Sequence, residues 1–291
     1  MSKTEDWLKS FKRETASIEN DWYKNKKAVS ISISSGKGGV GKTSLAIKVA
    51  IELSKEGYRV LLIDCDFNLS NTLIKLGLPL NNFFYEFIHR GRSFWDALYR
   101  NGHFHLLAGC NGHVGLFEQN IHFDQLIIDI INEYESNFDY IILDSPGGIS
   151  KTTLNLNAYT QKRIVVVTPD KSSITDSYSL IKLLKIRYGI YHNYLVVNRY
   201  CNEKQVNKVF KTMDETVENF LGLNLIHLGG IKEFHEKTDC FDTHLLNNSD
   251  SSFHQHFLNI VKNLHDNEKL GEHAHSSPLF SDVNSHLLCN L

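Results

Sequence analysis

The sequence lacks features that define several large classes of proteins. No apolar stretch approaches the roughly 20 residues that a membrane-spanning helix needs. A formal net charge of −2 over 291 residues provides no strongly basic domain, so we predict that nucleic acid is not a partner. The N-terminus is charged from Lys3 onward, which predicts that no signal peptide is present.

The sequence also has few cysteines, and they are not paired. The five cysteines are scattered, with an odd total and no C-x-x-C motif. This pattern argues against a disulfide framework and predicts reduced thiols in a cytoplasmic protein. Histidines gather at 103–113 and 235–256, but none has a ligand spacing supported by cysteines or carboxylates. We therefore expect no metal site built from histidines.

One octet carries most of the functional information. Residues 36–43 read Gly-Lys-Gly-Gly-Val-Gly-Lys-Thr and fit the phosphate-loop pattern G-x-x-x-x-G-K-[ST]. A β-branched run at 28–34 precedes the octet and a helical pattern at 43–55 follows it. The glycines let backbone N–H groups converge on phosphate oxygens, and the helix presents its positive N-terminal end. We expect nucleotide binding, with Lys42 at the β- and γ-phosphates and the Thr43 hydroxyl on Mg²⁺.

Strand-like and helix-like segments alternate along the middle of the chain. Near-continuous apolar runs are typical of parallel strands that are covered on both faces. The alternation predicts an α/β fold with a doubly wound, mostly parallel sheet and a ligand site at the carboxyl ends of the strands. The predicted strands are 60–64, 104–107, 140–144, 164–168, 194–198 and 225–228, and the predicted helices are 122–135, 174–187 and 203–220.

Two carboxylates lie at predicted strand ends. Asp66 follows the strand at 60–64 and is a candidate for orienting an attacking water, the alternative being a helix cap or a surface aspartate. Asp144 ends the strand at 140–144 in the Walker-B arrangement, which holds Mg²⁺ directly or through water. Gly147 and Gly148 follow it and predict a loop that is free to move with the γ-phosphate.

Asn198 closes another predicted strand, and two interpretations of it stay open. Its amide offers donors and an acceptor that can read an adenine edge, or it caps the next helix. The segment 168–178 enters a helix, and its residues alone predict only a well-capped helix start.

The two ends of the chain differ from its middle. Residues 1–27 place apolar residues, including Trp7, at a spacing that suits one stripe of a helix, which packs on the chain's own core or docks a partner. Residues 265–278 are polar and predict a mobile segment, after which apolar residues recur at helical spacing. We therefore expect a helical partner-docking extension at 1–27, a nucleotide-binding domain at 28–265 and a flexible tail with a candidate amphipathic helix at 266–291.

The combined motifs resemble those of the MinD/ParA family of deviant Walker A ATPases, which are P-loop NTPases of the SIMIBI class. The resemblance spans residues 28–265 and rests on the octet with its extra Lys37, on VLLIDCDFNLSNTLIKLGL at 60–78 and on DSPGGI at 144–149. Within the family, TPDKSSITDSYSLIKLL at 168–184 is most similar to the FlhG branch, as is the turn at 108–112.

The resemblance implies an ATP-dependent homodimer that acts as a switch. ATP would be held between two copies, with Lys37 of one copy at the phosphates bound by the other and Asp66 assisting the water. Hydrolysis would remove the γ-phosphate and separate the copies. Members of the FlhG branch control flagellar number and placement and bind the GTPase FlhF. The implied nucleotide-binding residues are Gly36, Lys37, Gly38, Gly39, Val40, Gly41, Lys42, Thr43, Ser44, Asn198 and Arg199, and the implied Mg²⁺ residues are Thr43, Asp66 and Asp144.

Three departures from the family pattern concern partners and the base. The N-terminal segment keeps the outline of the branch's FlhF-activating motif but has Trp7 where glutamine belongs, so docking is better supported than GTPase activation. Ile231-Lys232 replaces the family's Ile-Pro, which predicts a different wall beside the adenine. The tail from residue 270 onward has no Lys or Arg, so at most weak, peripheral contact with the inner membrane is expected.

Other functions stay open at this stage. A MinD-like cell-division or cargo-positioning ATPase has the same motifs, although the segment at 168–178 favours the flagellar branch. A nucleotide-binding adaptor with little turnover would have less need of Asp66 and Asp144. An ATP-dependent carboxylase or amidotransferase would need a second constellation of residues. An iron–sulfur carrier would need cysteines placed to share a cluster across a dimer, and the sequence offers neither feature.

Overall fold

The computed structural model describes residues 27–66, 71–109, 122–234 and 252–271. Within these residues, eight strands form one sheet in the order β3-β4-β2-β5-β1-β6-β7-β8. The strands are β1 (Val29–Ser34), β2 (Val60–Asp64), β3 (Tyr99–Asn101), β4 (Phe104–Leu107), β5 (Tyr140–Asp144), β6 (Lys162–Val167), β7 (Asn193–Tyr200) and β8 (Leu225–Lys232).

The sheet is parallel except at one edge, where β3 pairs antiparallel with β4. β1 lies between β5 and β6 and pairs in parallel with both. The chain leaves β1 for β2 on one side and later crosses from β5 to β6 on the other. The carboxyl end of β1 is therefore the topological switch point, where open α/β sheets bind their ligands.

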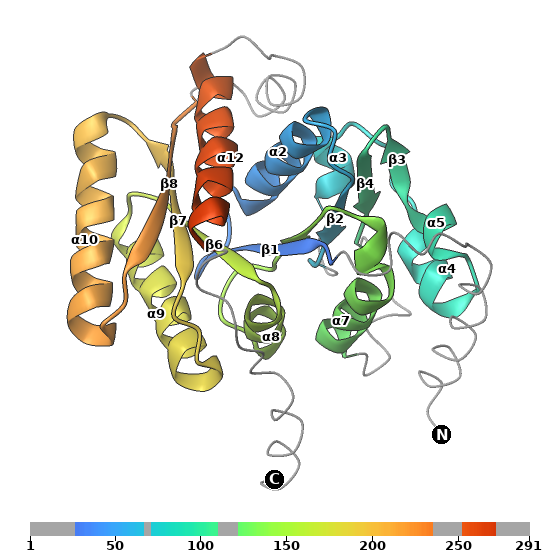
Figure 1. The fold of residues 1–291 in the computed structure, drawn as a ribbon, viewed down its shortest axis with the longest axis horizontal. Helices are drawn as coiled ribbons and strands as arrows, with labels where there is room; N and C mark the ends of the chain where they lie inside the picture. The colour runs from blue at the N-terminus through green and yellow to red at the C-terminus, as the bar shows by residue number, and fades with distance from the viewer. Residues whose placement is uncertain (1–26, 67–70, 110–121, 235–251, 272–291) are drawn as a thin grey trace, which may run out of the picture.

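Helices cover both faces of the sheet (Figure 1). One face packs against α2 (Lys42–Lys55) and α12 (Ser252–Gly271), and the other against α7, α8, α9 and α10. Strand residues alternate between the two layers, so that Ile142 packs on the α2 side and Ile141 on the α7 side. The remaining helices are α3 (Thr72–Lys75), α4 (Phe83–His89), α5 (Phe94–Ala97), α7 (Phe123–Tyr134), α8 (Lys151–Tyr159), α9 (Lys171–Tyr188) and α10 (Glu203–Leu221).

Every strand expected from an apolar run is present, with ends that differ by a few residues. The helices expected at 122–135, 174–187 and 203–220 are α7, α9 and α10. The helix α8 was not expected, because its sequence KTTLNLNAY has no clear apolar period. It is instead defined at its start by Ser150, whose side chain accepts a hydrogen bond from the N–H of Thr153 at 3.1 Å.

The C-terminal helix changes the expected domain boundary. The boundary predicted at residue 265 falls inside α12, which continues to Gly271, so the segment predicted to be mobile begins within a helix. Phe257, Ile260 and Leu264 are buried against the sheet and α2, while the outer face of the helix is polar. The expectations for 1–26 and for 272–291 lie outside the described residues. Across the described part of the chain, no helix combines the length and apolar character that crossing a membrane requires.

Candidate nucleotide site

The loop between β1 and α2 is held at the carboxyl end of the sheet. Gly41, at the N-cap of α2, has a φ of 96°, a left-handed conformation that favours glycine. A Cβ at Gly41 would lie 2.3 Å from Nδ2 of Asn198. That Nδ2 group donates a hydrogen bond to the carbonyl oxygen of Val40 at 2.7 Å. The phosphate loop is thus fixed by β7 as well as by β1.

The start of α2 is prepared for an anion. The first turn carries no acidic residue, so its free N–H groups and the positive end of the helix dipole are not neutralised by a carboxylate of the same turn. Lys42 is buried at this end, and burial lowers its pKa, while the charges of Asp144 and Asp66 raise it. A bound phosphate would add a negative charge that favours the protonated lysine.

Three aspartates gather where β2 and β5 end. Asp64 and Asp144 are aligned in the parallel register of the two strands, and both are buried. The carboxylate of Asp64 accepts hydrogen bonds from the hydroxyl of Thr72 and from the N–H of Asp66, the latter at 3.0 Å. Asp64 therefore supports the backbone of Asp66, the candidate for orienting water.

The surroundings of Asp144 fit a magnesium ion. Burial and then the charge of Asp64 raise the pKa of Asp144 to about 8, while a hydrogen bond from the side chain of Thr43 acts in the opposite direction. Among the described residues, Oδ1 of Asp144 and Oγ of Ser145 are buried without a hydrogen-bond partner. Mg²⁺ is held by one or two carboxylates, with hydroxyl, phosphate or water oxygens completing its shell. Asp144 and Thr43 would hold it, with Asp66 beside them.

The loop after β5 is packed against the phosphate loop. The N–H of Gly148 donates to the carbonyl oxygen of Ser35 at 3.1 Å. A Cβ at Gly147 would lie 2.9 Å from Cα of Gly38 and 3.2 Å from Nζ of Lys42. Glycine is needed at 147 for this close approach, in addition to the freedom of movement expected from the sequence. A displacement of either loop is therefore transmitted to the other.

The extra lysine of the octet contacts the start of α9. Nζ of Lys37 donates to Oγ of Ser172 at 2.7 Å and pairs with Oδ1 of Asp170 at 3.2 Å. Asp170 is the N-cap of α9 and accepts from the N–H of Ser173 at 2.9 Å. Partial burial raises the pKa of Asp170, but hydrogen bonds from Thr168, Ser172, Ser173 and Lys37 hold it well below its usual range. The segment at 168–178 is thus more than a helix start, because it holds Lys37.

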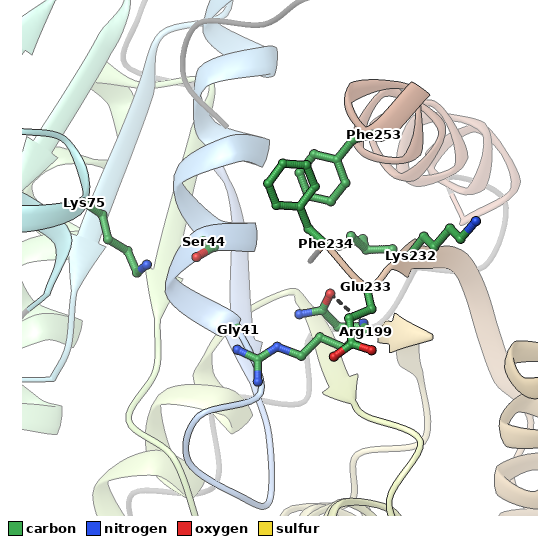
Figure 2. Close-up of a pocket in the computed structure, with 10 residues that line it drawn as sticks. Gly41, Ser44, Lys75, Arg199, Lys232, Glu233, Phe234 and Phe253 are labelled. Carbon is green, nitrogen blue, oxygen red and sulfur yellow. Dashed lines mark hydrogen bonds between the residues drawn. The ribbon is translucent and has the colours of Figure 1, made fainter. Parts of the chain in front are cut away.

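A pocket of about 240 Å³ opens beside Gly41 and Ser44 (Figure 2). One wall is aromatic, with the rings of Phe234 and Phe253 centred 5.0 Å apart. From the other side of α2, the side chain of Lys75 extends toward Ser44. A partly apolar pocket next to a phosphate loop suits the base and sugar of a nucleotide. The other residues that line it are Asn198, Arg199, Ile231, Lys232 and Glu233.

Asn198 is engaged by the protein itself. Besides the bond to Val40, its Oδ1 accepts from the N–H of Arg199 at 2.9 Å. The interpretation as a helix cap is wrong, because the N-cap of α10 is Asn202. Arg199 has a φ of 58°, which is uncommon for a residue other than glycine, and the Asn198 side chain stabilises it. Base recognition by Asn198 stays a prediction, to be made with its remaining N–H and lone pair.

Comparison with known proteins identifies the family. The AAA domain family matches residues 28–193. The antiactivator FleN of Pseudomonas aeruginosa is 27% identical over 202 residues, which cover 69% of this chain and 72% of FleN. The septum site-determining protein MinD of Bacillus subtilis is 33% identical over 199 residues, which cover 67% of this chain and 74% of MinD. The chain belongs to the MinD/ParA family of P-loop ATPases.

Solved MinD structures share the fold of this MinD/ParA ATPase. MinD of Pyrococcus horikoshii, solved with Mg-ADP, has a TM-score of 0.67 and 21% identity and covers 84% of this chain and 98% of its own. MinD of Aquifex aeolicus has a TM-score of 0.61 and 26% identity and covers 87% of this chain and 99% of its own. The expected fold class is confirmed. As a member of this family of ATPases, the chain binds and hydrolyses ATP.

The structure of this MinD/ParA ATPase places the predicted octet, Asp66, Asp144, Asn198 and Arg199 together at the carboxyl end of the sheet. Sequence reasoning missed Asp64, Lys75, Phe234 and Phe253 as parts of the site. Asp64 had a signal, because it stands two residues before Asp66 in the same motif. The aromatic pair had none, because only the packing of α12 beside β8 brings its members together.

Proposed function

We propose that this MinD/ParA ATPase is an ATP-dependent dimerisation switch that controls flagellar number or placement. The observation that carries the proposal is the position of Lys37, which is about half exposed and is held by Asp170 and Ser172 of its own chain. Such a lysine is accessible to a second copy. A cation that reaches the phosphates only across a dimer stabilises developing charge only after assembly, as an arginine finger does. The flagellar assignment is supported by the similarity to FleN and by the segment at 168–184.

The residues of the site divide the work in this proposal. Lys42 binds the β- and γ-phosphates, and Asp66 orients the attacking water. Thr43 and Asp144 would hold Mg²⁺, which would supply positive charge to the phosphate oxygens. The contact of Gly147 with the phosphate loop couples loss of the γ-phosphate to the loop after β5. Separation of the copies then resets the switch.

Asp66→Ala tests the switch directly. Loss of a positioned water-orienting group is expected to lower turnover about 100-fold or more, since such groups contribute that much. ATP affinity is expected to stay within a few-fold of wild type because Lys42 and the loop are intact. The molar mass measured by light scattering should then be that of a dimer with ATP·Mg²⁺ and of a monomer with ADP. Asp266→Ala, on the exposed face of α12, is the matched control. An Asp66→Ala protein that stays monomeric with ATP·Mg²⁺ would contradict the proposed switch.

Asp170→Asn tests whether the chain restrains its own Lys37. Asparagine keeps the N-cap of α9 but removes the carboxylate charge that pairs with Lys37. The pair is about half exposed, so it contributes roughly 0.5–1 kcal/mol. The released lysine is expected to tighten the ATP-bound dimer about two- to fivefold, measured as the dimer dissociation constant by sedimentation. A weaker dimer would mean that Asp170 belongs to the interface instead.

A septum-positioning role is the second candidate, favoured by the 33% identity to MinD of Bacillus subtilis. Deleting the gene in its host separates the two. Altered flagellar number or position with normally placed septa supports the flagellar role, whereas misplaced septa with normal flagella support the alternative. The flagellar proposal includes docking of an FlhF-like GTPase on residues 1–27 and weak peripheral membrane contact through 266–291 of an otherwise cytoplasmic protein. Deleting each segment separately in the host would test these two contacts.

A further inference from the structure

A second recess, of about 460 Å³, lies far from the phosphate loop. It is open to solvent between α4, α5 and β3, at the end of the sheet opposite α10 (Figure 1). β3 is four strands away from β1, which corresponds to roughly 19 Å across the sheet. We call this feature the arginine recess, and its lining residues are Glu86, Arg90, Gly91, Arg92, Asp96 and Arg100.

One arginine of the recess is fixed within the protein. Nε and Nη2 of Arg92 both lie 2.7 Å from Oε2 of Glu86, and Nη1 donates to the carbonyl oxygen of Asp96 at 3.1 Å. Its guanidinium carbon also lies 4.1 Å from the centre of the Phe83 ring. Arg92 therefore neutralises Glu86 and builds a rigid wall of the recess.

The other two arginines have no such partner. Arg90 and Arg100 are exposed, and among the described residues neither pairs with a carboxylate. The guanidinium carbon of Arg90 lies 5.6 Å from the centre of the Tyr85 ring. The remaining carboxylate, that of Asp96, accepts a hydrogen bond from the hydroxyl of Ser93 at 2.7 Å. Within the described part of the chain, the recess thus offers two guanidinium groups that are not paired with a carboxylate.

The two short helices beside the recess, α4 and α5, are joined by aromatic packing. Phe94 of α5 is buried, and its ring stacks on Tyr134 with centroids 3.7 Å apart and planes at 12°. Phe87 of α4 packs on Phe94 at 5.9 Å. This aromatic packing fixes the two short helices, so the arginines are displayed on a preformed surface. Preformed sites lose less conformational entropy when a partner binds.

We propose that the arginine recess binds an acidic peptide segment of a partner protein. Planar guanidinium groups match carboxylates bidentately, and two of those here are not paired with a carboxylate among the described residues. The lining holds three arginines and no lysine, a small basic site that fits a few carboxylates better than the extended anionic surface of nucleic acid or of a membrane. The open shape suits an extended segment more than a single ion. Since the recess is remote from the phosphate loop, a docked partner leaves the ATP site accessible.

The test measures binding of a fluorescein-labelled peptide of six glutamates to the full chain by fluorescence anisotropy at low salt. Arg90→Glu/Arg100→Glu is expected to weaken binding at least about tenfold, because each replaced attraction becomes a repulsion. Lys204→Glu/Lys208→Glu, on the exposed face of α10, changes net charge by the same amount and is expected to bind like wild type. ATP turnover should be unchanged in both variants. If the double charge-reversal variant fails to fold, the single variants Arg90→Gln and Arg100→Gln are tested in its place.

Three outcomes would overturn the proposal. The first is no detectable binding of the peptide by wild-type protein at millimolar concentration. The second is equal weakening in both charge-reversal variants, which would indicate attraction by overall charge. The third is binding of single-stranded DNA or of phosphatidylglycerol vesicles, but not of the peptide, through Arg90 and Arg100. Failure of the dimerisation switch would leave this proposal untouched, because no residue of the recess belongs to the ATP site.

Discussion

Lys42→Ala is expected to lower ATP affinity about 100-fold or more. Each hydrogen bond between charged groups contributes roughly 1.5–3 kcal/mol, and the ammonium group is placed for two phosphates. The structure strengthens this expectation, because Lys42 is buried beside Asp144 and Asp66. Without the lysine, the phosphates would meet two carboxylates with no nearby cation from the loop. Isothermal titration calorimetry with ATP·Mg²⁺ measures the effect.

Lys37→Ala is the matched control for that experiment. Lys37 also belongs to the octet, but in the single chain it contacts Asp170 and Ser172. Its loss is expected to leave ATP affinity within a few-fold of wild type. Nearly equal losses of affinity in the two variants would contradict the separate roles assigned to the two lysines. Unchanged thermal melting of both proteins without nucleotide would show that the fold is intact.

Glu52→Gln is expected to have the largest effect on stability, lowering the free energy of unfolding by about 3 kcal/mol. Glu52 pairs with Lys48 at 2.9 Å, and both side chains are buried inside α2. Burial lowers the pKa of Lys48, and burial would raise that of Glu52, but Lys48 and Lys55 hold the Glu52 pKa below its usual range. Removing the carboxylate leaves the Lys48 ammonium buried without its anion. Urea denaturation at neutral pH measures the loss.

The sign of the pH dependence follows from the lowered pKa of Glu52. The stabilising negative charge of Glu52 is fully present above the unfolded pKa near 4.3. It is lost as the pH falls through the lower pKa of the folded state, so the difference in the free energy of unfolding between Glu52→Gln and wild type becomes smaller in acid.

Glu215→Gln is the control, since Glu215 pairs with Lys211 at the same helical spacing but both are exposed. It should cost at most about 0.5 kcal/mol. The double change Lys48→Met/Glu52→Leu should restore stability to within about 1 kcal/mol. A loss below 1 kcal/mol for Glu52→Gln would contradict the buried-pair argument.

Local features of this ATPase were predictable because each depends on a short stretch of chain. The octet, the strand before it and the helix after it follow one another directly, and the phosphate loop occurs where expected. The same holds for Asp144, since an aspartate that ends a buried strand lies at the carboxyl end of the sheet. That β2 pairs with β5, and so places Asp64 beside Asp144, is known only from the structure.

The rest of the site depends on contacts between distant segments. Nothing near Asn198 in the sequence shows that its amide is bonded to Val40, 158 positions away. The restraint of Lys37 by Asp170 likewise spans 133 positions. The arginine recess arises because β3 turns back antiparallel to β4, a reversal that the apolar pattern did not predict. Periodicity identifies which residues form an element, but not which elements meet.

The position of Phe253 determines where this chain can be shortened. A cut after residue 271 would leave the aromatic wall beside the phosphate loop complete. A cut before residue 253 would remove one ring of that wall and uncover the sheet residues that Phe257, Ile260 and Leu264 now shield from water. The segment 253–264, which the sequence predicts to lie inside the nucleotide-binding domain, thus both lines the pocket and covers the sheet, and we expect its removal to expose apolar surface and to open the pocket.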